Sequence, residues 1–489
     1  MKKRYLFLCI LLDLCALAVI RLNLYVLNMP EFVCVILSLL IVLSNVLFFI
    51  KGQSKVLSKW VVSIFSTLCI CFTLFFSYCN PYWNSITYKE NVDFSCLTNT
   101  LSYAQAKEDL DYAMKHIKKL HPALLHGVPD NMEQQYEQIL KELETCEEID
   151  VYTLNRYIES IFSLLGDGHT YAKTYFSEPH YLKYTHEHNE NGQRLVEIDG
   201  FSIKELLEQN SHLYSYEVES WGLLCLKQDI STLEGLKYLG FTPENGVSYT
   251  YEDEEGNRET FTYKDSDFIT YEEYLEFNSI KDEEDTEEES FVSYEIDEER
   301  SLAVLTLTSC EYNEEYRNCL KEMFLKVKEM GIENVCVDLR DNGGGNSLVA
   351  DEFIRYLDVD SYDRATMTWR LGTFLIPFPD GKTVNQKYED LLFQGNVYLL
   401  TSESTFRSAM DFAQYIKDNH LGTIIGEAPG NTPNGYGEVS KFKLPNSQLY
   451  MQISTKEFFR VDKDSTDELV TPDVECDSDE AVDVLYESL

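Results

Sequence analysis

The pattern of apolar and polar positions divides the chain into two parts. Residues 32–50 and 60–78 are uncharged apolar runs, each close to the ~20 residues that a helix needs to cross a bilayer. Residues 5–20 form a third apolar run that Asp13 interrupts, and a carboxylate at mid-membrane costs about 2.5–3.5 kcal/mol. We therefore expect residues 1–83 to form a membrane anchor of two or three transmembrane helices.

The first apolar run has a second interpretation. A basic start, an apolar centre and the sequence Ala16-Leu17-Ala18 are typical of a cleaved signal peptide, and both interpretations stay open. The loop 51–59 holds three lysines and no acidic residue, which favours the cytoplasm for this loop. Either interpretation predicts a multi-pass protein of the cell membrane whose C-terminal domain is extracytoplasmic.

A linker at 84–101 leads into helical periodicity over residues 102–176. Three helices are predicted there. The first opens with Ser102 and Gln105 in a capping-box pattern, and the third ends in a tight turn at 166–170. We expect this segment to be a helical cap on the domain that follows.

The rest of the chain predicts an insertion and a core. Residues 177–300 suggest a divergent β-rich insertion, with a strand and turn at 195–200 and a solvated acidic loop at 282–289. Residues 301–489 alternate strands and helices, which indicates an α/β core. The predicted strands are 302–307, 335–339, 397–400 and 423–426, and the predicted helices are 313–330 and 408–419.

Charge and cysteine content narrow the function. The chain has 489 residues, with 41 Lys+Arg against 83 Asp+Glu and a formal net charge of −42, so phosphate repulsion argues against nucleic acid as a partner. The 13 cysteines include no CxxC pair, which gives no sign of a zinc ribbon. No metal or cofactor is expected.

Three segments carry candidate chemistry at the ends of predicted elements. Three glycines, 343–345, follow a strand and allow backbone amides to point at a ligand, although an ordinary flexible turn has the same composition. Ser408 lies where a loop becomes a helix, which suits a nucleophile and equally suits a plain N-cap. His169 lies at a helix end, where it can serve as a general base or as a structural residue.

Taken in order and spacing, these segments resemble the C-terminal-processing (tail-specific) serine peptidases and the tricorn core protease. The likeness covers about 102–176 and 300–476 and implies a ClpP/crotonase-like α/β core. It is carried by Leu164-Leu165-Gly166-Asp167-Gly168-His169-Thr170, Val337-Asp338-Leu339-Arg340-Asp341-Asn342-Gly343-Gly344-Gly345, Thr405-Phe406-Arg407-Ser408-Ala409, Ile425-Gly426-Glu427, Leu444-Pro445-Asn446-Ser447 and Thr471-Pro472-Asp473.

The resemblance assigns roles to individual residues. Ser408 matches the nucleophile, and the amides of Ala409 and of Gly344 or Gly343 match the oxyanion hole. Losing one such donor typically costs about 10²–10³-fold in rate.

The chain departs from the Ser–Lys dyad of the tail-specific branch, because no lysine lies between Lys417 and Lys441. A serine needs a base, and the tricorn-like branch uses a histidine, a role that His169 fits. A late acidic residue would orient the imidazole. Glu468 is the expected acid, with Asp467 and Asp462 as close competitors.

The sequence thus predicts a membrane-anchored extracytoplasmic serine peptidase that acts on peptides or proteins and contacts the lipid bilayer. Family members often carry a PDZ-like domain, and residues 197–200 resemble one element of it. Two alternatives remain: a non-catalytic peptide-binding or sensor protein of the same fold, and an acyl-CoA processing protein with a similar glycine-rich loop.

Overall fold

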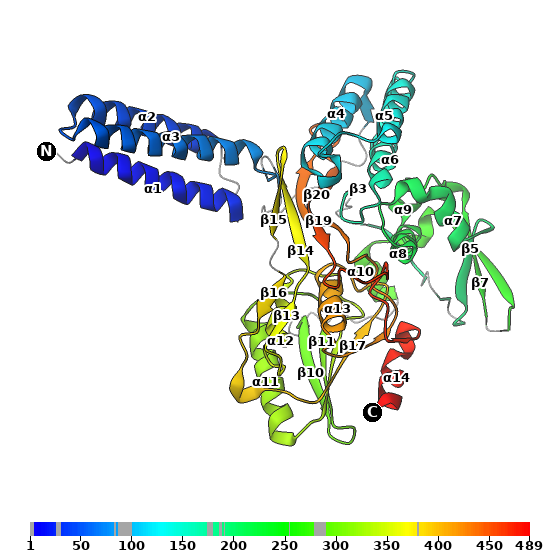
Figure 1. Cartoon of the computed structure of the whole chain (residues 1–489). Helices are drawn as coiled ribbons and strands as arrows, with labels where there is room; N and C mark the ends of the chain where they lie inside the picture. Colours follow the sequence, from blue (N-terminus) through cyan, green and yellow to red (C-terminus); the bar gives the residue numbers. More distant parts are fainter. Residues whose placement is uncertain are drawn as a thin grey trace.

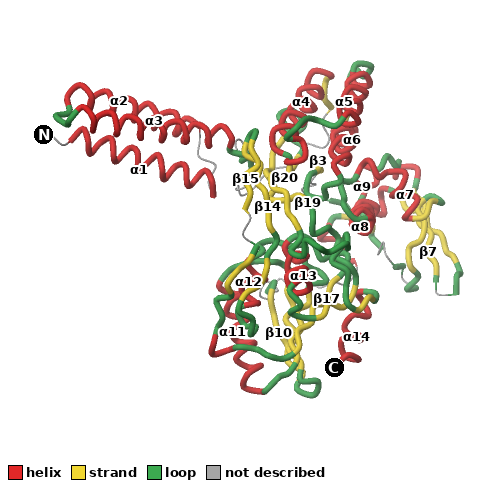
Figure 2. Tube along the Cα trace, in the orientation of Figure 1, coloured by secondary structure: helices red, strands yellow, loops and turns green. Residues whose placement is uncertain are grey.

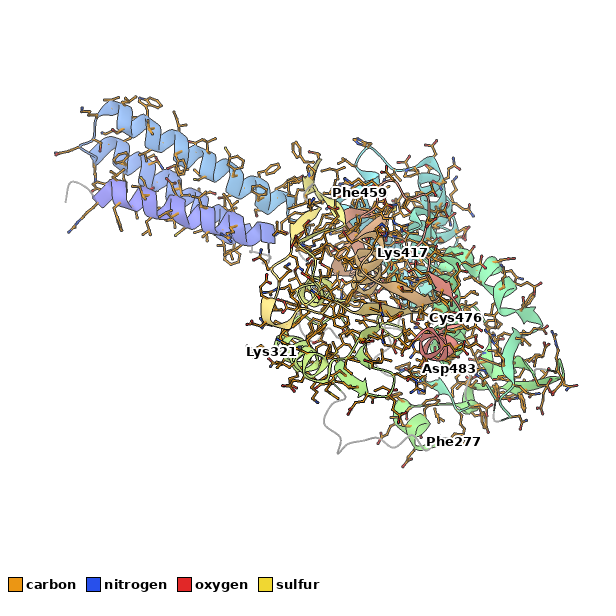
Figure 3. All side chains as sticks on the ribbon, turned by 60° about the horizontal axis from the view of Figure 1, so that its bottom comes forward. Phe277, Lys321, Lys417, Phe459, Cys476 and Asp483 are labelled. Carbon is orange, nitrogen blue, oxygen red and sulfur yellow. The ribbon has the colours of Figure 1, made fainter. Side chains whose placement is uncertain are left out.

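The computed structural model describes residues 4–25, 31–82, 85–86, 100–173, 179–184, 188–189, 191–253, 255–277, 290–378 and 381–489. Three apolar helices, α1 (Arg4–Tyr25), α2 (Glu31–Lys51) and α3 (Val56–Cys79), pack together and project from the rest of the molecule (Figure 1). All three are long and apolar enough to cross a membrane. Figure 3 shows side chains projecting around the outside of the bundle, and the end of α3 packs on the rest of the molecule through Phe75 and Phe76.

The polar residue in the first apolar run is accommodated inside this bundle. Asp13 is 3% exposed, and its Oδ2 accepts a hydrogen bond from Ser66 Oγ at 2.8 Å. This bond offsets part of the cost of burying the carboxyl group, whose Oδ1 has no hydrogen bond among the described residues. Of the two or three spanning helices that the sequence predicted, the described residues contain three that are long enough to span a membrane.

The helical cap forms as predicted. It contains α4 (Tyr103–Leu120), α5 (Asp130–Leu143) and α6 (Val151–Phe162), together with the short strands β1 (Thr100–Ser102) and β2 (Glu148–Asp150). Ser102 caps α4 and Gln105 completes the capping box. The apolar faces of these helices pack on residues of strands β19 and β20, among them Phe442 and Ile453.

The insertion is a mixed α/β unit, whereas the sequence suggested mainly strands. Its antiparallel sheet has the order β6 (Phe201–Ser202), β5 (Arg194–Ile198), β7 (Val247–Glu252) and β8 (Arg258–Tyr263). Helices α7 (Ile203–Asn210), α8 (Glu219–Ile230), α9 (Leu233–Tyr238) and α10 (Tyr271–Phe277) accompany it, with strands β4 (Tyr181–Leu182) and β9 (Phe268–Ile269). Leucines of α7 to α9 pack on the sheet tyrosines Tyr249 and Tyr251. The predicted acidic loop 282–289 lies outside the described residues.

The core sheet confirms the predicted α/β alternation. Its order is β10 (Val292–Asp297), β11 (Leu302–Leu307), β12 (Asn334–Asp338), β17 (Asn396–Thr401), β18 (Thr423–Gly426) and β21 (Val474–Glu475). Strand β10 is antiparallel to β11, and the other pairs are parallel. Helices α11 (Glu314–Met330), α12 (Leu348–Ile354) and α13 (Ser408–Asp418) contribute to the large core, and α14 (Ala481–Ser488) packs on the opposite face.

A second, antiparallel sheet joins the cap to the core. It has the order β15 (Phe374–Phe378), β14 (Thr366–Leu371), β20 (Tyr450–Phe459) and β19 (Gly435–Lys443), and β3 (Tyr171–Lys173) pairs with β20. The small pair β13 (Ser361–Asp363) and β16 (Lys382–Val384) lies beside it. Figure 2 shows the loops gathered where the two large sheets meet.

A buried ion pair fixes the end of β20 to the end of α13. Arg460 Nη2 lies 2.9 Å from Asp418 Oδ1, and the two side chains are 4% and 3% exposed. Arg460 Nη1 also donates to the carbonyl oxygens of Asp467 and Leu469. The loop that follows β20 is therefore held by a single guanidinium.

We predict that Arg460→Met lowers the free energy of unfolding by about 3–5 kcal/mol, because the buried Asp418 carboxylate loses its only charged partner among the described residues and keeps one backbone donor, the Asp462 N–H. Chemical denaturation of the full chain in detergent measures this. Arg300→Met is the matched control, since the Arg300–Asp297 pair is exposed and such pairs contribute about 0–1 kcal/mol. Equal losses for both variants would contradict the prediction.

Candidate functional site

His169 is placed by a tight turn between the cap and strand β3. Gly166, at φ 59°, ends the helical segment, and Asp167 Oδ1 accepts the His169 N–H at 2.9 Å. Gln452 Nε2, on β20, donates to the His169 carbonyl oxygen at 2.8 Å. The Phe406 ring stacks on the imidazole with centroids 5.0 Å apart. His169 is therefore fixed beside the segment that leads into α13.

Ser408 is the first residue of α13 and follows a strained turn. Arg407 has φ 54° and ψ −121°, a conformation that costs of order 1–3 kcal/mol for a residue with a side chain. The Arg407 N–H donates to Asn431 Oδ1 at 2.8 Å, which holds the turn. The strained turn sets the direction in which the Ser408 side chain leaves the backbone.

The glycine loop and this turn are in direct contact. Gly344 has φ 99°, and a Cβ there would lie 2.5 Å from Arg407 Cβ and 3.0 Å from Ser408 N, so only glycine fits. The carbonyl oxygen of Gly345 accepts a hydrogen bond from Ser408 Oγ at 2.9 Å. Two of the three predicted segments therefore converge.

The amides expected to form an oxyanion hole have partners within the protein. The Gly344 N–H donates to Asn342 Oδ1 at 2.9 Å, and the Ala409 N–H donates to the Phe406 carbonyl oxygen at 3.1 Å. No described heavy atom outside its chain neighbours lies within 4 Å of a Cβ placed on Gly343. The oxyanion role of these residues stays a prediction.

Ser408 and His169 line the same cavity, which has a volume of about 500 Å³. Gly345 and Arg407 also line it, together with residues of the β19 and β20 strands such as Gly437 and Lys456. The structure thus brings the third predicted segment to the other two. A peptide group placed in this cavity would have access to both side chains.

Two carboxylates face the Nδ1 atom of His169. Asp167 Oδ1 lies 3.6 Å from it and Glu217 Oε1 lies 3.8 Å from it. Both carboxylate side chains are buried, at 0% and 6% exposed. Within the described part of the chain, neither His169 Nδ1 nor Glu217 Oε1 makes a hydrogen bond of ordinary geometry.

Each carboxylate is held from its other oxygen. Asp167 Oδ2 lies 3.0 Å from His121 Nε2, and both of these side chains are fully buried. Glu217 Oε2 accepts from the backbone N–H and the hydroxyl of Thr432, at 2.9 and 2.7 Å. Glu217 belongs to the insertion, so the insertion contributes directly to the surroundings of His169.

Burial and these carboxylates set the protonation of His169. Burial by itself would lower the pKa of the imidazole, but the close carboxylates of Asp167 and Glu217 raise it, and the net effect is a raised pKa. The positive charge of Arg407 opposes this rise. Burial would raise the pKa of Asp167, yet hydrogen bonds to His121 and His169 hold it well below its usual range.

The predicted acids lie elsewhere. Glu468, Asp467 and Asp462 are exposed in the loop after β20, and none of them lines the cavity that holds His169 and Ser408. Asp167 belongs to the same Gly-Asp-Gly-His turn as His169, and this turn was the signal that could have revealed it. Glu217 has no sequence signal, because no motif links the insertion to the core.

The residues around His169 can also hold a cation. Asp167, His169 and Glu217 each offer one ligand atom, and these atoms lie within 4.8 Å of one another. The spacing suits a small divalent ion such as zinc, whose ligands lie about 2.0–2.2 Å from the metal. The same spacing suits a histidine oriented by carboxylates.

Comparison with known proteins identifies the family of the core and similar folds. Residues 301–476 match peptidase family S41. Mature CPAF has a similar structure, with a TM-score of 0.55 at 12% identity over 79% of this chain and 95% of that one. The photosystem II D1 C-terminal processing protease gives a TM-score of 0.41 at 13% identity over 76% and 93% of the two chains.

Tricorn protease gives a TM-score of 0.35 at 15% identity, over 79% of this chain and 37% of that one. Among curated protein sequences, none matches the chain. The predicted resemblance to the C-terminal-processing serine peptidases is confirmed by the family match, while the choice between a Ser–His and a Ser–Lys mechanism stays a prediction. The chain contains a peptidase domain of family S41, and its enzyme class is that of a serine peptidase.

Proposed function

We propose that the chain is a membrane-anchored serine peptidase in which Ser408 is the nucleophile and His169 the general base. One observation carries this proposal. Ser408 and His169 line one cavity, while Nδ1 of the imidazole faces two buried carboxylates. An acid on Nδ1 leaves Nε2 free to accept a proton, which is the arrangement that activates a serine.

In the proposed reaction, Ser408 Oγ attacks the carbonyl carbon of a peptide bond and its proton passes to His169 Nε2. The tetrahedral intermediate collapses to an acyl-serine, and the imidazolium gives the proton to the leaving amine. Water then attacks the acyl carbon while His169 Nε2 takes a proton from it. The imidazolium returns this proton to Ser408 Oγ as the carboxylic acid product leaves. The hydroxyl must first turn away from the Gly345 carbonyl oxygen, with which it is hydrogen-bonded at 2.9 Å.

Glu217 is the proposed orienting acid, with Asp167 as its partner. Glu217 Oε1 has no hydrogen bond within the described residues, so it is available to accept a hydrogen bond from the Nδ1–H group. Asp167 already binds His121 through one oxygen and the His169 amide through the other. The negative charge of the pair stabilises the imidazolium that forms during attack.

Gly344 and Ala409 are the proposed oxyanion donors. Both amides are hydrogen-bonded within the protein, to Asn342 Oδ1 and to the Phe406 carbonyl oxygen. Substrate would have to compete for them, and a developing oxyanion is a stronger acceptor than a neutral amide or carbonyl oxygen. Charge that develops in the transition state would therefore be stabilised more than the ground state.

The contact between the anchor and the peptidase domain supports action close to a bilayer. Phe75, in the last turns of α3, lies 5.8 Å from Phe374 between ring centroids. Phe374 is the first residue of β15 and is 55% exposed, and the hairpin it belongs to packs on the end of α3. If α3 spans the membrane, the β14–β15 hairpin lies at the membrane surface. Substrates would then be cleaved near that surface.

A second function, peptide binding without catalysis, is favoured by one observation. The Ser408 hydroxyl and both expected oxyanion amides are hydrogen-bonded internally. A protein that only binds peptides would need no release of these groups. Covalent labelling of the serine separates the two functions.

We predict that a fluorophosphonate probe labels the full chain in detergent at Ser408. Ser408→Ala should abolish labelling, because the nucleophile is lost. His169→Ala should slow it by about 10²–10⁴-fold, the usual contribution of a general base. Ser404→Ala, a neighbouring serine that does not line the cavity, is the matched control and should label normally. EDTA should change nothing, and absence of labelling in the unaltered chain would favour the binding protein.

The rate of labelling should depend on pH through His169. Because the pKa of His169 is raised above that of an ordinary histidine, the imidazole stays protonated to a higher pH, and labelling should rise only as the pH passes through the raised pKa. Glu217→Gln removes one group that raises this pKa. It should shift the midpoint to lower pH and reduce the plateau by about tenfold or more.

Glu234→Gln is the control for the pH profile, because Glu234 binds a different histidine of the same insertion, His180, at 2.8 Å. Its pH profile should match that of the unaltered chain. A Glu217→Gln profile that is also unchanged would rule out Glu217 as the orienting acid. The plateau alone does not decide this, since a loss of folded protein lowers it without moving the midpoint.

The orientation in the membrane is also a proposal. Lys51, Lys55 and Lys59 border the loop between α2 and α3, which favours the cytoplasm for this loop and the extracytoplasmic side for the peptidase domain. Protease added to intact cells should therefore digest a C-terminal tag and spare a tag inserted after Gln53. A shielded C-terminal tag, with the Gln53 tag digested, would show the opposite orientation.

A further inference from the structure

Arg407 stands at the junction of two cavities. It lines the cavity of about 500 Å³ that contains Ser408, and also an adjoining cavity of about 300 Å³. The lining of the smaller cavity includes four aromatic rings, those of Tyr171, Tyr214, Trp221 and Tyr238. Arg407 directly precedes Ser408, and its backbone is fixed by the bond to Asn431. Its side chain is therefore positioned with the nucleophile.

The guanidinium of Arg407 has no counter-ion in the described part of the chain. Its Nε is buried and makes no hydrogen bond there, and no ion pair among the described residues includes it. Its contact with the protein is the Phe406 ring, whose centroid lies 5.5 Å from Cζ. Arg407 as a whole is half-buried, and a ligand that enters the cavity could satisfy the Nε–H that no described residue accepts.

Carboxylates line the smaller cavity, but they are bound to other groups. Glu159 accepts hydrogen bonds from Ser215 Oγ at 2.7 Å and from the Ala172 N–H at 2.7 Å. Asp229 accepts from the Tyr214 hydroxyl at 2.9 Å. These acceptors serve the fold of the cap and the insertion and do not neutralise Arg407.

The carboxylates that line the larger cavity are also bound to groups other than Arg407. Asp411 accepts from Gln414 Nε2 at 2.7 Å, and burial raises the pKa of its carboxyl group to about 6. Glu438 pairs with Lys456 at 3.2 Å and accepts from the Tyr82 hydroxyl. Neither carboxylate is bonded to Arg407.

Positive charge gathers around this side chain instead. Burial lowers the pKa of Lys441, and the charge of Arg407 lowers it further. The same charge opposes protonation of His169. Arg407 thus acts on two other groups that carry positive charge when protonated, and a carboxylate bound to its guanidinium would reduce these repulsions.

We propose that Arg407 is a specificity residue that binds a carboxylate of the peptide substrate beside the scissile bond. The inference rests on the proposed peptidase function. A guanidinium binds a carboxylate through two parallel hydrogen bonds, and this geometry suits an unpaired arginine next to the nucleophile. The carboxylate comes either from an Asp or Glu side chain flanking the bond or from a chain terminus close to it.

The experiment compares matched probes on the full chain in detergent. The first arm uses peptidyl diphenyl phosphonates that differ only in carrying Glu or Gln at the residue that reacts with Ser408. The second uses internally quenched peptides that end in a free carboxylate or an amide shortly after the cleaved bond. In one arm the acid form should react about tenfold or more faster than its neutral partner, as expected for a hydrogen bond to a charged group.

Arg407→Gln should bring that ratio close to one, and Arg407→Lys should restore part of it. Arg317→Gln, an exposed arginine of α11, should leave the ratio unchanged. Because both rates in a ratio come from the same variant, a general loss of activity in that variant does not change the ratio of acid to neutral probe. A ratio near one in both arms with the unaltered chain overturns the inference even if Arg407→Gln does not fold. So does a ratio that survives in Arg407→Gln.

The fluorophosphonate result separates this inference from the proposed function. If the unaltered chain labels at Ser408 but shows no acid preference, the peptidase assignment stands and the role of Arg407 is wrong. If it does not label at all, the proposed function fails first.

Discussion

The backbone of Gly344 lies directly against the turn that carries Ser408, and the geometry of the site depends on this contact. The glycine loop and the turn follow β12 and β17, which are neighbouring parallel strands, so both segments leave the same edge of the sheet. A side chain at Gly344 would collide with Arg407 Cβ at 2.5 Å. Separating the two segments would remove the hydrogen bond between Gly345 and Ser408 and tilt the start of α13.

The second half of the site is held by different forces. Strand β3 pairs with β20, and the Gln452 side chain binds the His169 carbonyl oxygen. The imidazole stacks on Phe406, which in turn stacks on Trp221 of the insertion at 3.8 Å between centroids. The cap, the core and the insertion therefore meet around one histidine. The insertion is part of the site, since it also supplies Glu217.

The charges around the site differ from the acidic average of the chain. Acidic residues outnumber basic ones two to one overall, yet Arg407 remains without a carboxylate partner among the described residues, and the acids around it are bound elsewhere. The buried carboxylates of Asp167 and Glu217 face His169, not Arg407. This separation leaves one side of the cavity suited to stabilising an imidazolium and the other side suited to attracting an anion.

Local patterns in the sequence were sufficient to predict the apolar spans, the helices of the cap and the alternating strands and helices of the core. They were also sufficient to select His169, the glycine loop at Gly343 and Ser408 as candidate site residues. Each of these features depends on residues near one another in the chain. The tertiary structure decided which carboxylate meets His169: Glu217, from an insertion without a motif, lies there, and Glu468 lies in an exposed loop. It also decided that the Gly344 and Ala409 amides have internal partners and that, among the described residues, no carboxylate pairs with the Arg407 guanidinium. These outcomes depend on how separate elements pack against one another. The periodicity and spacing of residues along the chain do not predict distances between residues that are far apart in sequence.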